Sequence, residues 1–167
     1  MNIFFLDFDV KKCAEYHCDK HVVKMRLETA QLLCSAHHVT GGAAQYKLSH
    51  KNHPCSIWVR SSLSNYLYLC ELGLELGKEY THRYGKIHST YTKLKDLLKL
   101  NPINIPNIPF KDPPPAMSHF PLCIVPNNSL YSYYNYYIVA KNYFAKWTNR
   151  PIPEWYSTGL STKKLYA

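Results

Sequence analysis

The residues best suited to chemistry lie on one helix, which the sequence predicts between positions 9 and 38. Projected at about 100° per residue, its polar side chains form a narrow stripe. The stripe consists of His17, Lys20, His21, Lys24, Glu28 and Gln31. Apolar residues flank it on both sides, so we expect both sides of the helix to be buried and the stripe to line a cleft. Titratable groups at the edge of a core acquire shifted pKa values, which suit nucleophiles and acid–base groups.

An amine is the predicted nucleophile of this stripe. We assign that role to Lys24, because the neighbouring Lys20 and partial burial would favour its neutral, reactive form. Glu28 or His21 would transfer protons, and His17 would orient the reacting group. The alternative is a solvated polar face on which Lys24 pairs with Glu28 one turn away.

Two further groups of basic side chains flank the next predicted helix, one in the loop before it and one in its last turn. Antiparallel packing would place the two groups near opposite ends of the stripe, so only one of them can meet His17, and we expect the loop to be the closer. Basic side chains at these places would hold phosphates. The predicted nucleic-acid contacts are Lys20, His50, Lys51, His53, Arg83 and Lys86.

Metal-assisted chemistry is a weaker alternative. His17 and His21 are four positions apart and could share a metal ion, with His53 or Glu28 as a third ligand. The neighbouring lysines oppose a dication, so we expect no metal and no other cofactor. The sequence also lacks a glycine-rich phosphate loop, a Gly-x-Ser-x-Gly elbow and a dinucleotide fingerprint. These absences argue against kinases, α/β-hydrolases and dinucleotide oxidoreductases.

The composition is that of a basic globular protein. Hydrophobic residues make up 46% of the 167 residues, charged residues make up 19%, and the net charge is +9. This charge favours DNA, another nucleic acid or a phosphorylated ligand as partner. Sixteen of the twenty basic residues are lysines, which contact phosphates well but lack the fork with which arginine reads guanine.

The expected fold is mainly α, a compact single-domain helical bundle spanning residues 1–167. Helical spacing predicts helices at about 9–38, 54–85, 90–100 and 129–148, after a short extended N-terminal arm. Gly73 and Gly77, one turn apart, would let another helix approach closely. Eight of the eleven prolines fall within 101–126, which predicts a long surface loop.

The last predicted helix is rich in tyrosine, with lysines interspersed. Such a surface could stack on exposed bases; alternatively, about half of the tyrosines belong to the core. The six cysteines show no Cys-x-x-Cys spacing, and neither a signal peptide nor an apolar run of membrane-spanning length is found. We therefore expect an intracellular monomer, cytoplasmic or nuclear, that is not secreted, has buried thiols and has no membrane contact.

Several motifs together resemble the pyrimidine-dimer DNA glycosylases, the small phage and viral endonuclease V type. Ala14-Glu15-Tyr16-His17-Cys18 stands where that family has an Ala-Asp-Gln-His run, and His37 to Gly42 is similar to its helix exit. The stretch from Trp58 to Gly85 resembles its second long helix, which ends in Arg-x-Gly. Trp155-Tyr156 and Tyr166-Ala167 resemble its aromatic C-terminus.

The resemblance implies a compact helical enzyme that flips a base, cleaves the glycosidic bond and nicks the backbone. It implies an amine nucleophile beside a glutamate, the amine being the N-terminus freed by loss of the initiator Met. Here residue 2 is Asn rather than a small residue, Lys24 falls at the glutamate position, and Val23 and Leu27 replace two arginines. We therefore expect a shared scaffold with altered chemistry.

The sequence thus predicts a nucleic-acid-acting enzyme of the DNA glycosylase/lyase kind. Its predicted catalytic residues are His17, His21, Lys24 and Glu28. Two alternatives remain: a histidine- or metal-dependent hydrolase of RNA or nucleotides, and a non-catalytic nucleic-acid-binding protein on the same scaffold.

Overall fold

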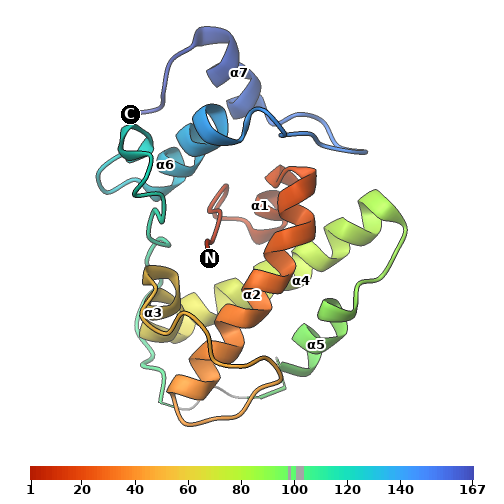
Figure 1. Ribbon diagram of the computed structural model, residues 1–167, viewed down its shortest axis with the longest axis vertical. Helices are drawn as coiled ribbons and strands as arrows, with labels where there is room; N and C mark the ends of the chain where they lie inside the picture. The colour runs from red at the N-terminus through yellow and green to blue at the C-terminus, as the bar shows by residue number, and fades with distance from the viewer. Residues whose placement is uncertain (98, 101–103) are drawn as a thin grey trace.

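Helices form most of the architecture. The structure is a computed structural model that describes residues 1–97, 99–100 and 104–167. Its α-helices are α1 (Val10–Tyr16), α2 (Asp19–Val39), α3 (Pro54–Ser61), α4 (Leu63–Tyr84), α5 (Ser89–Leu97), α6 (Ser129–Tyr136) and α7 (Glu154–Thr162). Apart from one isolated bridge, these described residues contain no β-structure. The predicted mainly α, compact fold is confirmed (Figure 1).

The long helices α2 and α4 form the centre of the fold. α4 packs against α1, α2, α3 and α5, and Figure 1 shows α6 and α7 together at the opposite end from α3 and α5. As their spacing predicted, the two glycines of α4 let neighbouring helices, α2 and α5, approach α4 closely. A β-carbon at Gly73 would lie 2.9 Å from Thr29 of α2, and one at Gly77 would collide with Tyr91 of α5.

The single helix predicted over 9–38 is wrong, because the chain turns at His17 and Cys18. Both residues have extended backbone, with ψ of 131° and 162°. Contacts from distant segments hold the turn. The Tyr137 hydroxyl accepts the Cys18 N–H at 3.3 Å, and Arg83 donates to the Glu15 carbonyl at 2.9 Å. Because these groups are bonded outside the helix, α1 and α2 are separate elements.

The helix predicted over 54–85 is also two helices, α3 and α4. Ser62 between them has extended backbone, with φ of −153° and ψ of 138°. Its hydroxyl donates to the Ile108 carbonyl at 2.6 Å, and the next N–H, of Leu63, donates to the Pro106 carbonyl at 2.9 Å. The proline-rich segment therefore bonds to the backbone at the break. Gly85, with φ of 65°, ends α4 as predicted.

The helix predicted over 129–148 ends earlier than expected. α6 is followed by a π-helix, Tyr137–Lys141, and the chain then leaves helical geometry. The C-terminal helix α7 was not predicted. It packs closely on the π-helix, because a β-carbon at Gly159 would collide with Ile138. Of the tyrosines in this region, Tyr133 and Tyr137 are fully buried, whereas Tyr143 is 81% exposed.

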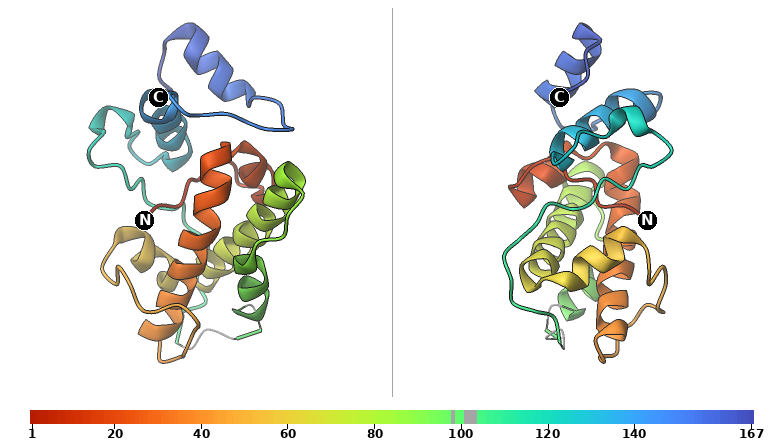
Figure 2. Two further views of the ribbon diagram at one scale, coloured as in Figure 1. Left: turned by 45° about the vertical axis from the view of Figure 1, so that its right-hand side comes forward. Right: turned by 90° about the vertical axis from the view of Figure 1, so that its left-hand side faces the viewer.

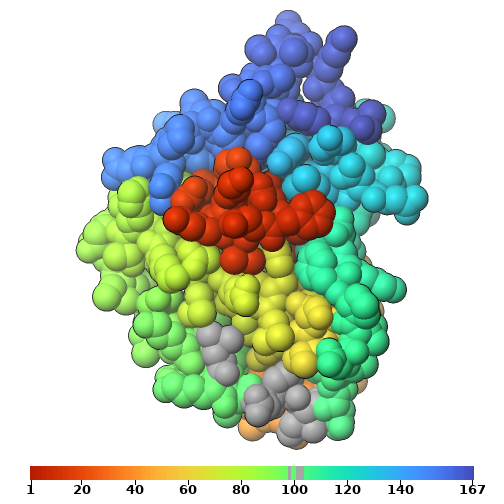
Figure 3. All heavy atoms as spheres, turned by 180° about the vertical axis from the view of Figure 1, so that it is seen from behind, coloured from red at the N-terminus to blue at the C-terminus, as the bar shows by residue number. Residues whose placement is uncertain are grey.

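The N-terminal arm is extended and largely buried. Residues 3–6 are each at most 3% exposed. The arm lies along α2, since the Phe4 ring stacks on His21 with centroids 4.0 Å apart and the Asn2 N–H bonds to Glu28. Figure 3 shows, from behind, the part of the N-terminal segment that reaches the surface, in red, between the C-terminal part of the chain and α4.

The proline-rich segment runs along the outside of the helices from residue 104 onward (Figure 2). It is held to α3 and α4 through Lys111, whose carbonyl accepts from Trp58 Nε1 at 2.7 Å and whose N–H donates to Asn65 at 3.0 Å. Residues 101–103 of the predicted loop, and residue 98 of the helix predicted over 90–100, lie outside the described residues. None of the described helices is long and apolar enough to cross a membrane.

Candidate active site at the N-terminal arm

Glu28 of α2 lies between two nitrogen atoms. Its Oε1 is 3.2 Å from the ammonium of Lys24, one turn back on the same helix. Its Oε2 accepts the backbone N–H of Asn2 at 3.1 Å. The Glu28 side chain is 13% exposed, so the carboxylate is largely shielded from water yet reachable. A carboxylate in this position can accept a proton or stabilise a cation.

Residue 2 is fixed by contacts from the C-terminal half of the chain. The Tyr133 hydroxyl of α6 donates to Asn2 Oδ1 at 2.5 Å, and Asn2 Nδ2 donates to the Ala116 carbonyl at 3.2 Å. The Ala116 N–H in turn donates to the Tyr133 hydroxyl. Tyr133 is fully buried, and burial raises its pKa well above the ordinary value. A neutral, rigid phenol therefore holds Asn2 against Glu28.

The loop before α3 approaches the same carboxylate. Burial lowers the pKa of His53, the positive charges of the chain's amino terminus and of His50 lower it further, and Glu28 raises it. These effects need proximity, so the amino end, His53 and Glu28 occupy one region. His53 also caps α3, accepting the Cys55 N–H at 3.2 Å. The structure thus brings this loop to the Glu28 end of the stripe. The end of α4 lies nearer His17, since Arg83 and Glu79 both act on the pKa of His17, so the expectation that the loop would be the closer partner of His17 was wrong.

His21 is buried behind this region as a neutral imidazole. Its Nδ1 lies 2.6 Å from the Tyr137 hydroxyl, and the Phe4 ring covers one face. Burial lowers its pKa to about 2, assisted by the charges of His17, Lys141 and other cations nearby. At neutral pH it can hydrogen-bond, but it carries no proton to give as an imidazolium ion.

His17 lies at the other end of the stripe, away from Glu28. It is 1% exposed, and its Nδ1 lies 2.6 Å from the Cys13 carbonyl at the turn between α1 and α2. Burial lowers its pKa to about 4; Arg83 lowers it further, while Glu79 acts in the opposite direction. His17 therefore lies near Arg83 and Glu79 rather than near Glu28. Its bond to the Cys13 carbonyl stabilises the turn between α1 and α2.

Lys24 occupies the surface rather than a cleft. Its side chain is 68% exposed, so the partial burial assumed from the sequence is absent. The reason is that the second apolar strip of α2 is open: Val23 is 46% exposed and Leu27 is 40% exposed. The expectation that α2 is buried on both sides was wrong, and Lys24 stands beside Glu28 at an open edge.

Of the six predicted phosphate contacts, His53 belongs to the cluster around Glu28, and the other five divide into two groups. Four of them lie on the surface, where a nucleic acid can reach them: Lys20, His50, Lys51 and Lys86. Arg83 differs, because its side chain has no exposure and all its nitrogens are engaged. It donates to Glu79 at 2.7 Å, to Asp19 at 2.8 Å and to the Glu15 carbonyl at 2.9 Å. Because its side chain is fully buried among these partners, Arg83 is out of reach of a phosphate on the surface.

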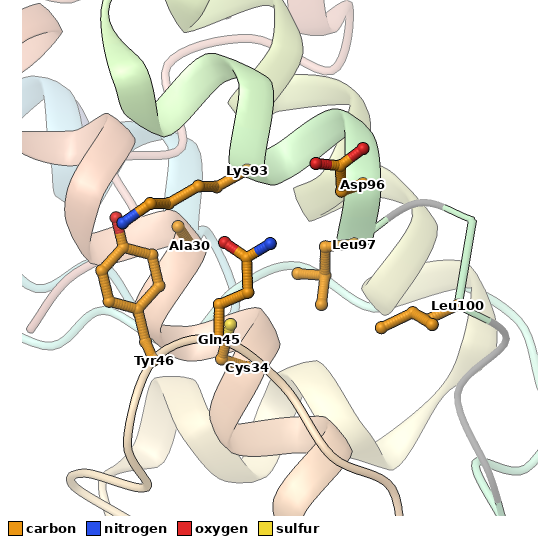
Figure 4. Close-up of a pocket in the computed structure, with 8 residues that line it drawn as sticks. All are labelled: Ala30, Cys34, Gln45, Tyr46, Lys93, Asp96, Leu97 and Leu100. Carbon is orange, nitrogen blue, oxygen red and sulfur yellow. The ribbon is translucent and has the colours of Figure 1, made fainter.

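A separate pocket of about 230 Å³ opens between α2, the loop after it and α5. Figure 4 shows Gln45 and Lys93 reaching across it above Cys34, with Leu97 and Leu100 on the far wall. Cys34 lies six positions along α2 from Glu28, about 240° around the helix. The pocket therefore opens on a different face from the Glu28 cluster and adds no group to it.

Comparison with known proteins gives the family. The model of the pyrimidine dimer DNA glycosylase family matches residues 1–93, which is more than half of the chain. This chain belongs to that family. Neither the curated proteins nor the solved structures contain a match.

The glycosylase match covers the arm, the four helices α1–α4 and the first half of α5. It therefore contains Asn2, Lys24, Glu28 and His53, which are all the groups of the cluster except the clamp on residue 2. Tyr133 and Ala116 lie beyond residue 93, so a segment outside the match completes the site.

Sequence reasoning missed Asn2 and Tyr133 as site residues. The only signal for Asn2 was the family resemblance, which implies an amine at the start of the arm. Tyr133 could not be separated from the tyrosines around it. Among the described residues, no three His, Cys, Asp or Glu side chains are grouped as a metal site would need.

Proposed function

We propose that this protein is a DNA glycosylase with lyase activity that attacks through an amine held beside Glu28. The observation that carries the proposal is the double contact of Glu28, to the Lys24 amine at 3.2 Å and to the backbone amide N–H of Asn2, one residue from the chain's amino terminus, at 3.1 Å. An amine next to a carboxylate is what the family resemblance implies for this chemistry. The family match supports DNA as the substrate.

The reaction needs an amine and a proton carrier in contact. The neutral amine attacks C1′ of the sugar, a C–N bond forms, and the glycosidic bond breaks as the base leaves with its electron pair. The amine then loses two protons, one to the departing base and one to O4′ of the sugar, as the ring opens to an imine. Removal of the C2′ proton then expels the 3′ phosphate. Glu28 is the group placed to accept and return these protons.

Two amines can serve. The α-amine is the first choice. Met1 carries it in this chain, next to the clamped Asn2, and a nucleophile held in this way loses little entropy on attack. In general α-amines have reference pKa values about two to three units below lysine, so more of the neutral form is present at pH 7. Lys24 is the second choice, since it contacts the same carboxylate but moves freely in water.

Borohydride trapping tests the proposal. The protein is mixed with a duplex that carries one abasic site, borohydride is added, and the covalent adduct is located by mass spectrometry of its peptides. We compare the unmodified chain, Lys24→Met, and chain whose α-amine has been selectively acylated. The proposal expects an adduct on the arm peptide that is lost on acylation and kept in Lys24→Met.

The outcomes separate the alternatives. An adduct that is lost in Lys24→Met transfers the nucleophile to Lys24. The absence of any adduct, with duplex binding intact, contradicts the lyase proposal and leaves a DNA-binding protein without this chemistry. Nicking of ultraviolet-irradiated plasmid, with untreated plasmid as control, tests whether the damaged base is the one named by the family.

A further inference from the structure

Arg26 of α2 is a buried cation that lacks a counter-charge. The residue is 1% exposed. Its Nε donates to the Val22 carbonyl at 2.9 Å and one terminal nitrogen donates to the Val23 carbonyl at 3.2 Å. The other terminal nitrogen has no hydrogen-bond partner, and no carboxylate pairs with Arg26, among the residues that the structure describes.

Burying this guanidinium destabilises the fold unless another interaction offsets the loss of its hydration. A buried charge without a partner is strongly unfavourable, and a well-packed apolar side chain is usually better tolerated. The ring of Tyr80 lies on the guanidinium at 3.7 Å, which offsets part of the cost through a cation–π contact. The remaining unpaired nitrogen points to an anion as the missing partner.

Two residues that contact Arg26, Val23 and Tyr80, line a hollow of about 300 Å³. It is lined by Val23, Tyr80, Tyr84 and Lys86, and it adjoins a second hollow that contains Lys20 and Lys24. The two hollows share Val23 and Tyr84, so they form one open groove. The second hollow also contains Asp19, but this carboxylate already bonds Arg83 and Thr148.

The groove therefore combines positive charge with apolar and aromatic walls. Val23, which is 46% exposed, forms part of its floor, and lysines stand at both rims. Phosphates are the anions that such lysines and an arginine fork hold best. A sugar and base attached to the phosphate could pack on the tyrosine and valine walls.

We propose that this groove binds a phosphate of the DNA strand, with Arg26 and Lys86 as its ligands. The inference rests on the proposed function, and it extends the DNA contact beyond the Glu28 site. Val23 is five positions from Glu28, so the two places are on the order of 10 Å apart across α2. That is about three base-pair rises of 3.4 Å along the duplex axis. Lys24 lies between the two places on α2.

Tyr80 acts as the cover of this phosphate site. Its ring is half-buried and lies over the guanidinium, so the unpaired nitrogen becomes available when the ring turns aside. Lys86 follows the end of α4 and is exposed, so it meets the strand first.

The test uses Arg26→Met, Lys86→Ala and Lys78→Ala. Lys78 is the matched control, because it is an exposed lysine of α4 that pairs with Glu75 and lines a different hollow. Binding to an undamaged duplex is measured by fluorescence anisotropy over a range of salt. We expect Arg26→Met and Lys86→Ala to weaken binding about five- to tenfold, each lowering the salt slope by about 1. Lys78→Ala should change binding less than twofold.

Stability separates a binding role of Arg26 from a packing role. Because Met removes an unpaired buried charge, Arg26→Met should melt at the same temperature as the unmodified chain or higher. Inorganic phosphate, compared with chloride at equal ionic strength, should raise the melting temperature of the unmodified chain but not of Arg26→Met. The proposal is overturned if Arg26→Met melts at a lower temperature yet binds DNA normally. It is also overturned if Arg26→Met is no longer stabilised by phosphate but keeps its full affinity for DNA.

The result is independent of the test of the proposed function. If the unmodified chain forms the borohydride adduct while Arg26→Met and Lys86→Ala bind normally, the groove proposal fails and the glycosylase proposal stands. If no adduct forms but both variants lose affinity and salt slope, the groove proposal stands without the chemistry.

Discussion

Glu28 and Glu79 both join a helix to a distant part of the chain, and they do so in opposite ways. Glu79 of α4 is 3% exposed and accepts from Arg83 at 2.7 Å and from Arg150 at 2.8 Å and 3.0 Å. Glu28 accepts one backbone N–H and pairs with one mobile lysine. The first carboxylate is saturated with charge-assisted bonds, whereas the second keeps lone pairs free.

The difference separates a structural carboxylate from a reactive one. Hydrogen bonds to the charged form, led by those of Arg150 and Arg83, outweigh burial and lower the pKa of Glu79. Such a group holds helices in place and cannot exchange protons near neutral pH. Glu28 has weaker partners and an open edge, which leaves it able to act on a ligand.

The largest effect is expected for Glu28→Gln. The amide keeps the shape and can still accept from Asn2, but it takes up no proton. The rate of borohydride trapping should fall about 10²- to 10⁴-fold, the usual contribution of a proton-transfer group. The free energy of unfolding, from urea denaturation, should change by less than about 1 kcal/mol. A trapping rate within threefold of the unmodified chain would remove Glu28 from the chemistry.

Glu79→Gln should act on stability instead. Removing its charge leaves Arg83 and Arg150 without their shared partner, and breaking a buried pair costs about 3–5 kcal/mol. Urea denaturation should report that loss, while the trapping rate per folded molecule stays within about twofold at low temperature. An unchanged urea midpoint for Glu79→Gln would contradict the assignment of a structural role to Glu79.

Acid should weaken the Glu79 side of the molecule through His17. Its pKa is about 4 in the fold against 6.5 in the unfolded chain, so between these values only the unfolded chain binds a proton. The contribution is therefore fully present above pH 6.5 and is lost as the pH falls toward 4. It amounts to roughly 3 kcal/mol. The free energy of unfolding, measured by urea denaturation at several pH values in this range, should depend less steeply on pH in His17→Asn than in the unmodified chain. The difference in slope should correspond to at most one proton. Equal slopes would contradict the assignment.

The smallest effect is expected for Lys24→Met. The pair with Glu28 is exposed on the lysine side, and such i,i+4 pairs contribute about 0.3–0.5 kcal/mol. Stability should therefore change by less than about 0.5 kcal/mol, and added salt should reduce the difference further. A loss above 1.5 kcal/mol would mean that Lys24 holds the arm in place.

The helical class and the apolar face of α2 could be predicted from periodicity, but the breaks could not. No proline or glycine marks the turn at Cys18 or at Ser62. The groups that stabilise them come from Tyr137, 119 positions from Cys18, and from Ile108, 46 positions from Ser62. Helix breaks that depend on such distant contacts cannot be predicted from the local sequence pattern.

For the site, helical spacing was enough to bring Lys24 and Glu28 together. It could not tell that Val23 and Leu27 would stay exposed, because an apolar strip looks the same whether or not another helix covers it. It also placed Arg83 among the phosphate contacts, since a basic residue near a helix end gives no sign of buried carboxylate partners. Asn2 lies in an extended arm, where no periodicity singles out one residue.

The bond between Tyr133 and Asn2 joins positions 131 residues apart. During translation residue 2 is made at the start, and Tyr133 follows after roughly 7–26 s at typical elongation rates of 5–20 residues per second. The arm therefore waits for most of synthesis without the tyrosine that fixes it. A chain still on the ribosome, or one that stops early, carries the family-matched segment but lacks the clamp. The contacts of the arm with α2 can form early, but the full set of bonds around residue 2 requires synthesis to pass Tyr133.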